Sequence, residues 1–240
     1  MGRNCAEFRG NPFVDFWRSA GVGFADSPAS AAVTYSSSAA EWEAAWPRQQ
    51  HRVIALTGAP GPFPGEDPAV RRLQGLFAWT EPRRAQAAER AKRWFGTAPW
   101  IAAHIRIGPD WIKACKLGVG MRRFFASPQC TLPERRVSAA TCTPTVEQMA
   151  AQLAAIAKET AATGIFVGTD SKATFAALEA QLTGAGLLLH QLPENAPLED
   201  LALFSIARHF VGNCVSSFTA VTVRERLARG EPSYFWGATE

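Results

Sequence analysis

From residue 100 to residue 229, short apolar runs alternate with longer segments of helical character. The apolar runs predict strands, and the segments between them predict helices. Such alternation is typical of a parallel sheet with helices on both faces, so we predict an α/β fold. The expected strands are 101–107, 165–168, 186–192 and 210–213, and the expected helices are 145–162, 172–182, 198–208 and 218–229.

Each expected helix begins near a residue that can cap it. These residues are Thr143 or Thr145, Ser171, Glu199 with Asp200, and Ser216 with Ser217. The stretch 113–142 breaks the alternation, and we expect a cysteine-tied excursion there. Residues 1–98 are an irregular α/β region, with a short strand at 51–56 and a helix from Glu81-Pro82 to about residue 95.

Composition narrows the class of protein. The chain has 240 residues, enough for one large or two small domains, with 47% hydrophobic and 19% charged residues. No apolar run is long enough to span a membrane. The net charge of +4 is mild and the arginine pairs are scattered, which favours a small anionic ligand or a solvated surface over nucleic acid.

The five cysteines lack the spacing of a zinc site or a redox pair. Disulfides and buried free thiols therefore both stay open. Four of the cysteines lie in the second half of the chain and allow three pairings, which leaves Cys5 over.

Residues 104–111 look like the end of a buried strand. Because side chains alternate along a strand, His104 and Arg106 share one face, while Ile105 and Ile107 take the other. Open α/β sheets bind ligands at the carboxyl ends of their strands. The planar fork of Arg106 suits a phosphate, although an arginine at a strand end is about as often a rim salt bridge.

Residues 213–220 follow an expected strand and open an expected helix. Backbone N–H groups and the hydroxyls of Ser216, Ser217 and Thr219 meet there, which is a ready site for an anion. The alternative is that Ser216 or Ser217 only caps the helix. Capping and phosphate binding are compatible.

Two acidic residues lie at ends of expected elements: Asp170 after a strand, and Asp200 in the first turn of a helix. A carboxylate can accept two donors from the edge of a guanine ring. Acidic residues are also common in first turns for dipole reasons alone, and that reading is favoured for Asp200 when taken by itself.

Several motifs are missing. The chain contains no P-loop, no Asp-x-Asp pair for a metal-held diphosphate, no Gly-x-Ser-x-Gly elbow and no histidines at metal spacing. These absences argue against a P-loop NTPase and against a serine hydrolase of the Gly-x-Ser-x-Gly type.

The segments 104–111, 127–130, 168–171 and 209–220 together resemble the protein O-fucosyltransferase family. So do shorter stretches at 10–17, 58–64, 224–226 and 235–237, and the match runs from about residue 5 to residue 237. The resemblance implies an inverting, metal-independent glycosyltransferase of GT-B type without a cofactor. Such an enzyme moves L-fucose from GDP-β-L-fucose to a Ser or Thr of EGF-like repeats, as found in Notch-type proteins.

The resemblance also assigns residues. It makes Arg106 the catalytic residue that binds the β-phosphate, with His104 and Ile105 beside it in the nucleotide pocket. Asp200 reads the guanine, and Ser216, Ser217 and Phe218 lie at the diphosphate. Asp110, Asp170 and Thr219 are further candidates for this site. The family further implies the disulfides Cys115–Cys142 and Cys130–Cys214.

The resemblance divides the chain into residues 1–98, a remnant of the acceptor-side half, 99–220, the GDP-fucose-binding half, and 221–240, a helix and tail that pack back on the first half. The family's Gly-Arg-Phe-Gly-Asn-Gln loop, its signal peptide and its retention tetrapeptide have no match here. We expect a monomer of the endoplasmic reticulum lumen with an incomplete N-terminal half. A non-catalytic module that binds GDP-fucose or EGF repeats, and a different GT-B enzyme, stay open.

Overall fold

The computed structural model describes residues 78–120 and 136–237, together with Ser19, Gly21, Ala40 and Ala44. The chain divides into two compact units, residues 1–62 and 63–240. Every element named below lies in the second unit. The strand expected at 51–56 lies outside the described residues.

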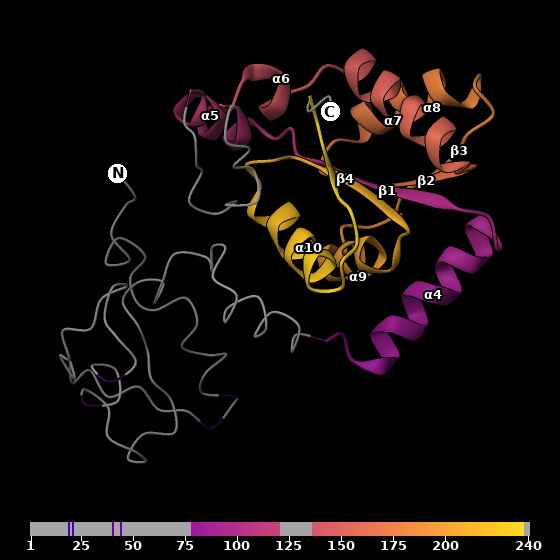
Figure 1. Ribbon diagram of the computed structural model, residues 1–240, viewed down its shortest axis with the longest axis horizontal. Coiled ribbons are helices and arrows are strands. Elements are labelled where there is room, and N and C mark those ends of the chain that lie inside the picture. Colours follow the sequence, from indigo (N-terminus) through magenta and orange to yellow (C-terminus); the bar gives the residue numbers. More distant parts are fainter. Residues whose placement is uncertain are drawn as a thin grey trace. The chain divides into compact units, whose positions relative to one another are not determined.

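The second unit is built on a five-stranded sheet of order β3-β2-β1-β4-β5 in which every neighbouring pair is parallel (Figure 1). This confirms the predicted α/β fold. The strands are β1 (Trp100–Ile105), β2 (Gly164–Thr169), β3 (Leu188–His190), β4 (His209–Gly212) and β5 (Tyr234–Phe235). The described helices are α4 (Glu81–Phe95), α5 (Pro109–Gly118), α6 (Ala139–Cys142), α7 (Val146–Thr160), α8 (Lys172–Thr183), α9 (Pro197–Ile206) and α10 (Ser217–Ala228).

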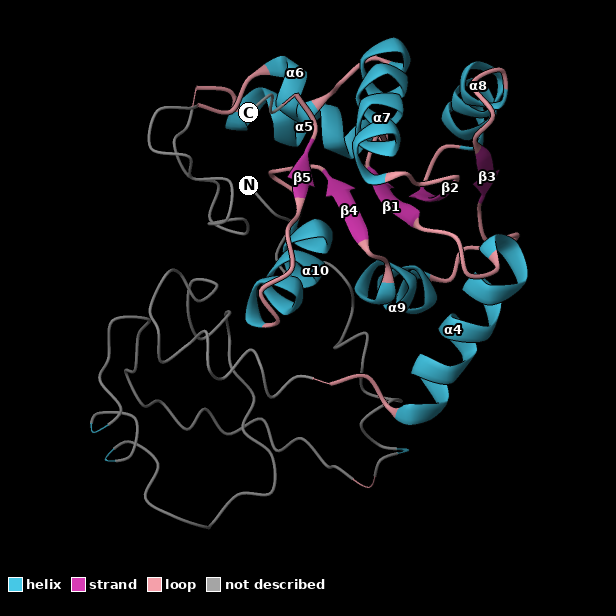
Figure 2. Ribbon diagram, turned by 45° about the vertical axis from the view of Figure 1, so that its right-hand side comes forward, coloured by secondary structure: helices cyan, strands magenta, loops and turns pink. Residues whose placement is uncertain are grey.

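The helices cover both faces of the sheet, with α7 and α8 on one side and α4, α9 and α10 on the other (Figure 2). Alternation along β1 fills both layers. Ile101, Ala103 and Ile105 pack into the cluster beneath α7 and α8, whereas Ala102 packs into the cluster beneath α4 and α9. His104 follows Ala102 on that second face, as the sequence predicts.

Most elements start and end within a few residues of the expected positions. The strand expected at 101–107 instead ends at Ile105, because α5 begins four residues later, at Pro109. Helix α5 was not predicted. The sequence prediction instead has an irregular segment that starts at residue 113, inside this helix. Its proline start and its two lysines obscure the helical period of a segment only 10 residues long.

Side-chain caps explain where three of the helices begin. Thr145, Ser171 and Ser216 each accept a hydrogen bond from a backbone N–H in the first turn of the helix that follows. The expectation that Glu199 or Asp200 caps α9 is wrong. This helix has no side-chain cap, and it starts with Pro197 at a position where the missing N–H costs nothing.

The end of the chain belongs to the same unit as the sheet. Helix α10 packs against α9, and β5 adds a strand next to β4. Trp236 is fully buried, and its indole N–H donates to the carbonyl oxygen of His104 at 2.8 Å. The tail therefore supports the strand end that carries His104.

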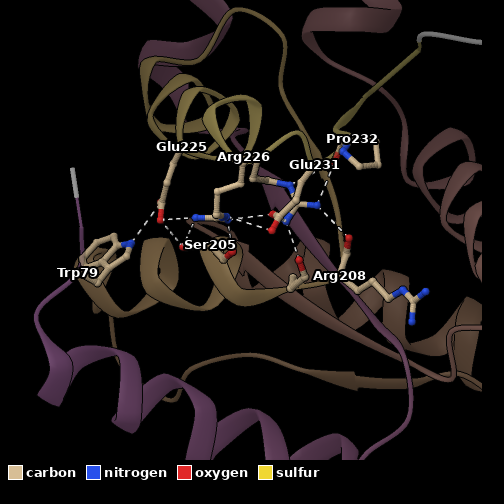
Figure 3. A network of polar contacts seen from close by, with 9 residues as sticks. Trp79, Ser205, Arg208, Glu225, Arg226, Glu231 and Pro232 are labelled. Atoms are coloured by element: carbon tan, nitrogen blue, oxygen red, sulfur yellow. Dashed lines mark hydrogen bonds and ion pairs between the residues drawn. The ribbon is translucent and has the colours of Figure 1, made fainter. Parts of the chain in front are cut away.

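Arg226 fixes this arrangement from inside α10. Its side chain is fully buried and donates to the carbonyl oxygens of Ala207 at 2.5 Å, Arg208 at 2.9 Å and Pro232 at 2.9 Å (Figure 3). Glu231 lies 3.3 Å away and balances its charge. One guanidinium thus joins residues 207–208, which precede β4, to Pro232, which precedes the neighbouring strand β5.

Glu225, the residue before Arg226, connects α10 to the start of α4. Its carboxylate accepts hydrogen bonds from the hydroxyl of Ser205 at 2.6 Å, from Arg229 at 2.7 Å and from the indole of Trp79 at 3.2 Å (Figure 3). A buried carboxylate needs such partners to offset its lost hydration. The contact places Trp79 in the same polar network as α9 and α10.

The predicted disulfide Cys115–Cys142 is present and joins α5 to α6. Cys214 is also disulfide-bonded, and Cys130, the partner that the family implies, lies outside the described residues. Val137, Val215 and Trp111 pack around the Cys115–Cys142 bridge in a small core of their own.

Replacing both Cys115 and Cys142 with serine should lower the stability of this region. The bridge closes a loop with a sequence separation of 27, so the chain-entropy model gives a loss of about 3.5 kcal/mol in the free energy of unfolding. Chemical denaturation of the double variant and the parent protein measures the difference. A difference below about 1 kcal/mol would contradict a stabilising bridge.

No helix among the described residues is both long enough and apolar enough to cross a membrane.

Candidate functional site

A pocket of about 860 Å³ opens at the carboxyl ends of β1 and β2, and the first turns of α9 and α10 form its other walls. In the sheet order, the chain moves from β1 to β2 and β3 on one side, and then returns to the other side of β1 as β4. Open α/β sheets bind ligands where the strand order reverses in this way. The pocket therefore lies where the topology predicts a ligand.

His104 forms part of the pocket wall at the end of β1. Its Nδ1 lies 2.7 Å from the hydroxyl of Thr219, and its ring packs between Phe204 and Phe218, with centroids 5.7 and 5.0 Å away. Burial lowers the pKa of His104 to about 3, outweighing the carboxylate of Asp170, which raises it. The imidazole is therefore neutral at physiological pH and offers the pocket a hydrogen-bonding group without charge.

Arg106 follows His104 just beyond the strand, where its guanidinium reaches two carboxylates. One terminal nitrogen pairs with Asp170 and the other with Asp110, at 2.6 Å. Both acids and the arginine line the pocket. The rim salt bridge that the sequence left open thus exists, and it lies inside the pocket.

Asn213 anchors the backbone at this strand end. Its side-chain oxygen accepts the N–H of Arg106 at 2.7 Å, and its amide nitrogen donates to the carbonyl oxygen of Cys142 at 3.2 Å. The indole of Trp111 donates to the same carbonyl at 2.8 Å. A fully buried Asn with both ends bonded fixes the position of Arg106 relative to the disulfide. The sequence suggested no such role, because the contact joins residues 107 positions apart.

The start of α10 forms the wall next to Arg106. Ser216 is buried and caps the helix by accepting the N–H of Phe218 at 3.2 Å, whereas Ser217 is exposed. Ser216, Ser217 and Phe218 all line the pocket. Capping is therefore what Ser216 does here. The cap directs the first turn, with its positive end, into the pocket.

Asp200 lies in the opposite wall, in the first turn of α9. Burial raises the pKa of its carboxyl to about 7, and the charge of neighbouring Glu199 adds to this effect. A β-carbon at Gly168 would lie 3.3 Å from the carboxyl carbon of Asp200 and 2.5 Å from the ring of Phe204. The glycine at the end of β2 thus allows α9 to approach the strand closely.

Helix α4 supports this wall from outside. Arg90 forms an ion pair with Glu199 at 2.6 Å and lies over the ring of Trp94, 5.5 Å from its centroid. Trp94 stacks in turn on His190 and Phe166, which belong to the sheet. The first turn of α9, which carries Asp200, is held in place by this contact.

The structure brings nearly all the predicted site residues together. His104, Ile105, Arg106, Asp110, Asp170, Asp200, Ser216, Ser217 and Phe218 line the pocket. Thr219 does not; it is fully buried and reaches the site only through His104. The sequence missed the lining residues in the connection after β3, which are Gln191, Leu192, Pro193, Glu194 and Asn195. Their position at or just after the carboxyl end of an expected strand was the available signal.

Among the described residues, no group of three or more His, Cys, Asp or Glu side chains could hold a metal ion.

Comparison with known proteins decides the family. The family model for GDP-fucose protein O-fucosyltransferase matches residues 3–229. This chain belongs to that family. GDP-fucose protein O-fucosyltransferase 1 of Caenorhabditis elegans is 28% identical over 250 residues, which cover 97% of this chain and 63% of the relative. The chain thus spans less than two thirds of the length of that protein.

Solved structures of the O-fucosyltransferase family share the fold. POFUT1 in complex with GDP-fucose superposes with a TM-score of 0.78 at 27% identity, covering 98% of this chain and 69% of that one. The apo form of POFUT1 gives a TM-score of 0.79 at 28% identity, with 99% and 70% covered. These matches confirm the expected α/β fold of GT-B type.

Proposed function

We propose that this O-fucosyltransferase family member transfers L-fucose from GDP-β-L-fucose to a Ser or Thr of EGF-like repeats, with inversion at the sugar carbon and without a metal. The single observation that carries the proposal is the meeting of Arg106 with the N-terminus of α10 in one pocket, opposite Asp200. A diphosphate fits between the first two, and a guanine fits at the third.

The positive groups of the pocket suit the leaving group. When the hydroxyl oxygen of the acceptor bonds to the sugar carbon, the bond from that carbon to the β-phosphate oxygen breaks, negative charge grows on GDP, and the hydroxyl proton passes to the leaving GDP or to water. Arg106 and the first turn of α10 are held in place before this happens, by Asn213 and by the Ser216 cap. Fixed positive groups aimed at developing charge are usually the largest single contribution to catalysis. In this proposal they take the place of a metal.

The substrate and the compartment follow from the family, and we include both in the proposal. EGF-like repeats are disulfide-rich secreted modules, and the Cys115–Cys142 bridge suits the oxidising compartment through which such modules pass. We therefore place the protein in the endoplasmic reticulum lumen, as a monomer that meets EGF-like repeats of Notch-type proteins. Nucleic acids and membranes are not among its proposed partners.

Two measurements on the intact protein test the proposal. Calorimetry should detect binding of GDP-fucose, and transfer of labelled fucose to a folded EGF-like repeat should proceed equally with and without a chelator. Product analysis should show an α-linked fucose if the configuration inverts. Loss of transfer on chelation would contradict the metal-free mechanism. Absence of both binding and transfer would overturn the proposal.

A second candidate function is a binding module that holds GDP-fucose or an EGF repeat without transferring the sugar. It is favoured by the pocket itself, because Arg106 and the first turn of α10 could hold a nucleotide diphosphate whether or not a sugar is transferred. The same pair of measurements separates the two functions, since the module would bind GDP-fucose in the calorimeter and give no product in the transfer assay. Binding and transfer measured with other nucleotide sugars test the remaining hypothesis, that the chain is a GT-B enzyme with a different donor.

A further inference from the structure

The guanidinium of Arg106 is shared between two carboxylates. Its two terminal nitrogens pair with Asp170 and with Asp110, so each half of the fork that would face a phosphate already has an anion. Each terminal nitrogen keeps a second N–H, but a phosphate that approaches both nitrogens also meets the negative charge of both carboxylates, so it binds best when one of them moves away. Which one leaves is decided by how each is held.

Asp170 is held firmly. Besides Arg106, it accepts the backbone N–H of Ile107 at 3.1 Å and that of Gly108 at 2.9 Å, and its side chain is 29% exposed. These bonds fix the carboxylate to the turn between β1 and α5. A β-carbon at Gly108 would lie 2.7 Å from an oxygen of Asp170. The turn can therefore come this close to the carboxylate only because residue 108 is glycine.

Asp110 is held differently. It stands in the first turn of α5, four residues after Arg106, and its side chain is 71% exposed. An ion pair with so much water around it contributes little free energy, so a small change can break it. Both carboxylates touch the same guanidinium, yet only Asp110 can swing into solvent at little cost.

We infer that the two acids act on Arg106 in opposite ways: Asp170 is a positioning residue that keeps the guanidinium aimed into the pocket, and Asp110 occupies the phosphate subsite until a diphosphate displaces it. The inference rests on the proposed binding of GDP-fucose. In the unliganded pocket, the carboxylate of Asp110 neutralises Arg106 and competes with other anions for it. When GDP-fucose binds, its diphosphate takes the place of this carboxylate.

The inference predicts opposite signs for two substitutions that each remove one negative charge beside Arg106. Asp110→Asn should raise the affinity for GDP about two- to five-fold, because the diphosphate no longer competes with an internal carboxylate. Asp170→Asn should lower it about ten-fold, because an amide cannot accept from the guanidinium and both backbone N–H groups together. General charge repulsion would raise the affinity in both variants.

Calorimetry with GDP and with GMP measures these effects. GMP lacks the β-phosphate, so Asp110→Asn should leave its affinity within about two-fold of the parent's. An equal gain for GMP would overturn the assignment of Asp110 to the β-phosphate subsite. Since Asp110 is exposed, this arm stays informative even if Asp170→Asn folds poorly.

A double-variant cycle separates positioning from support of the fold. If Asp170 acts through Arg106, Asp170→Asn should change GDP affinity less than about two-fold in an Arg106→Ala background. A full loss of about ten-fold in that background would mean that Asp170 only supports the turn, and would overturn its positioning role. If the parent protein binds no GDP, the proposed function fails. If the parent binds and both variants gain affinity, the inference alone fails.

Discussion

An Arg106→Ala protein should transfer fucose at least about 100- to 1,000-fold more slowly than its parent, which corresponds to roughly 2.7–4 kcal/mol of transition-state stabilisation. Arg106 is the one guanidinium among the described residues that lines the pocket. Its backbone is fixed by Asn213, and its side chain lines the same pocket as the first turn of α10. The substitution also removes the cation beside Asp170, so this carboxylate adds repulsion of the diphosphate to the lost attraction.

Arg106→Lys should recover little of this rate, because an ammonium is a point charge and cannot donate two parallel hydrogen bonds. Arg93→Ala is a matched control, since it removes the same side chain from the exposed face of α4. Rates measured with saturating GDP-fucose and one EGF-like repeat compare the three variants. Transfer by Arg106→Ala within about ten-fold of the parent's would refute its role in catalysis.

The second large effect concerns Asp200, the residue proposed to hold the guanine. Asp200→Asn should weaken GDP binding about 10- to 100-fold, because a carboxylate accepts both edge donors of guanine and an amide accepts only one. In the parent protein, affinity for GDP should fall as the pH drops from about 8 to about 6. The pKa of Asp200 lies at about 7, so the carboxyl becomes protonated over this range and loses an acceptor.

The free energy of unfolding should depend on pH in the opposite direction to GDP affinity, and should rise as the pH falls. Folding raises the pKa of Asp200 from 3.8 to about 7, so the folded state is disfavoured as the pH rises through this interval and the buried carboxyl ionises. At about pH 8, Asp200→Asn should therefore melt at a higher temperature than the parent, and at about pH 4 the gain should vanish. Glu159→Gln, on the exposed face of α7, is the control for loss of one negative charge. An equal difference in melting temperature between variant and parent at both pH values would contradict a raised pKa of Asp200 in the folded state.

The parts of this site that periodicity specifies were predictable from sequence. The apolar alternation of β1 puts His104 on one face and Ile105 on the other, and the serines after β4 indicate a helix start whatever surrounds them. The position of Arg106 at a strand end follows from the same pattern.

Contacts between distant residues were not predictable in this way. The pairing of Arg106 with Asp170 joins residues 64 positions apart, and it depends on the register of β1 beside β2. The raised pKa of Asp200 depends on burial that only the packed helix α9 supplies. Strand β5 was missed because two residues cannot show a period, and its place in the sheet depends on Arg226 and Trp236.

The packing of helix α4 bears on where a boundary for the sheet-containing unit should be placed. The family resemblance divides the chain after residue 98, which assigns α4 to the acceptor side. In the structure, Ala87, Ala91 and Phe95 are buried in the cluster beneath the sheet, and Arg90 is paired with Glu199. A recombinant nucleotide-binding domain, or a chimera that exchanges acceptor halves between family members, should therefore keep the chain from Trp79 onward. A junction at residue 99 would remove the helix that supports the pocket wall carrying Asp200.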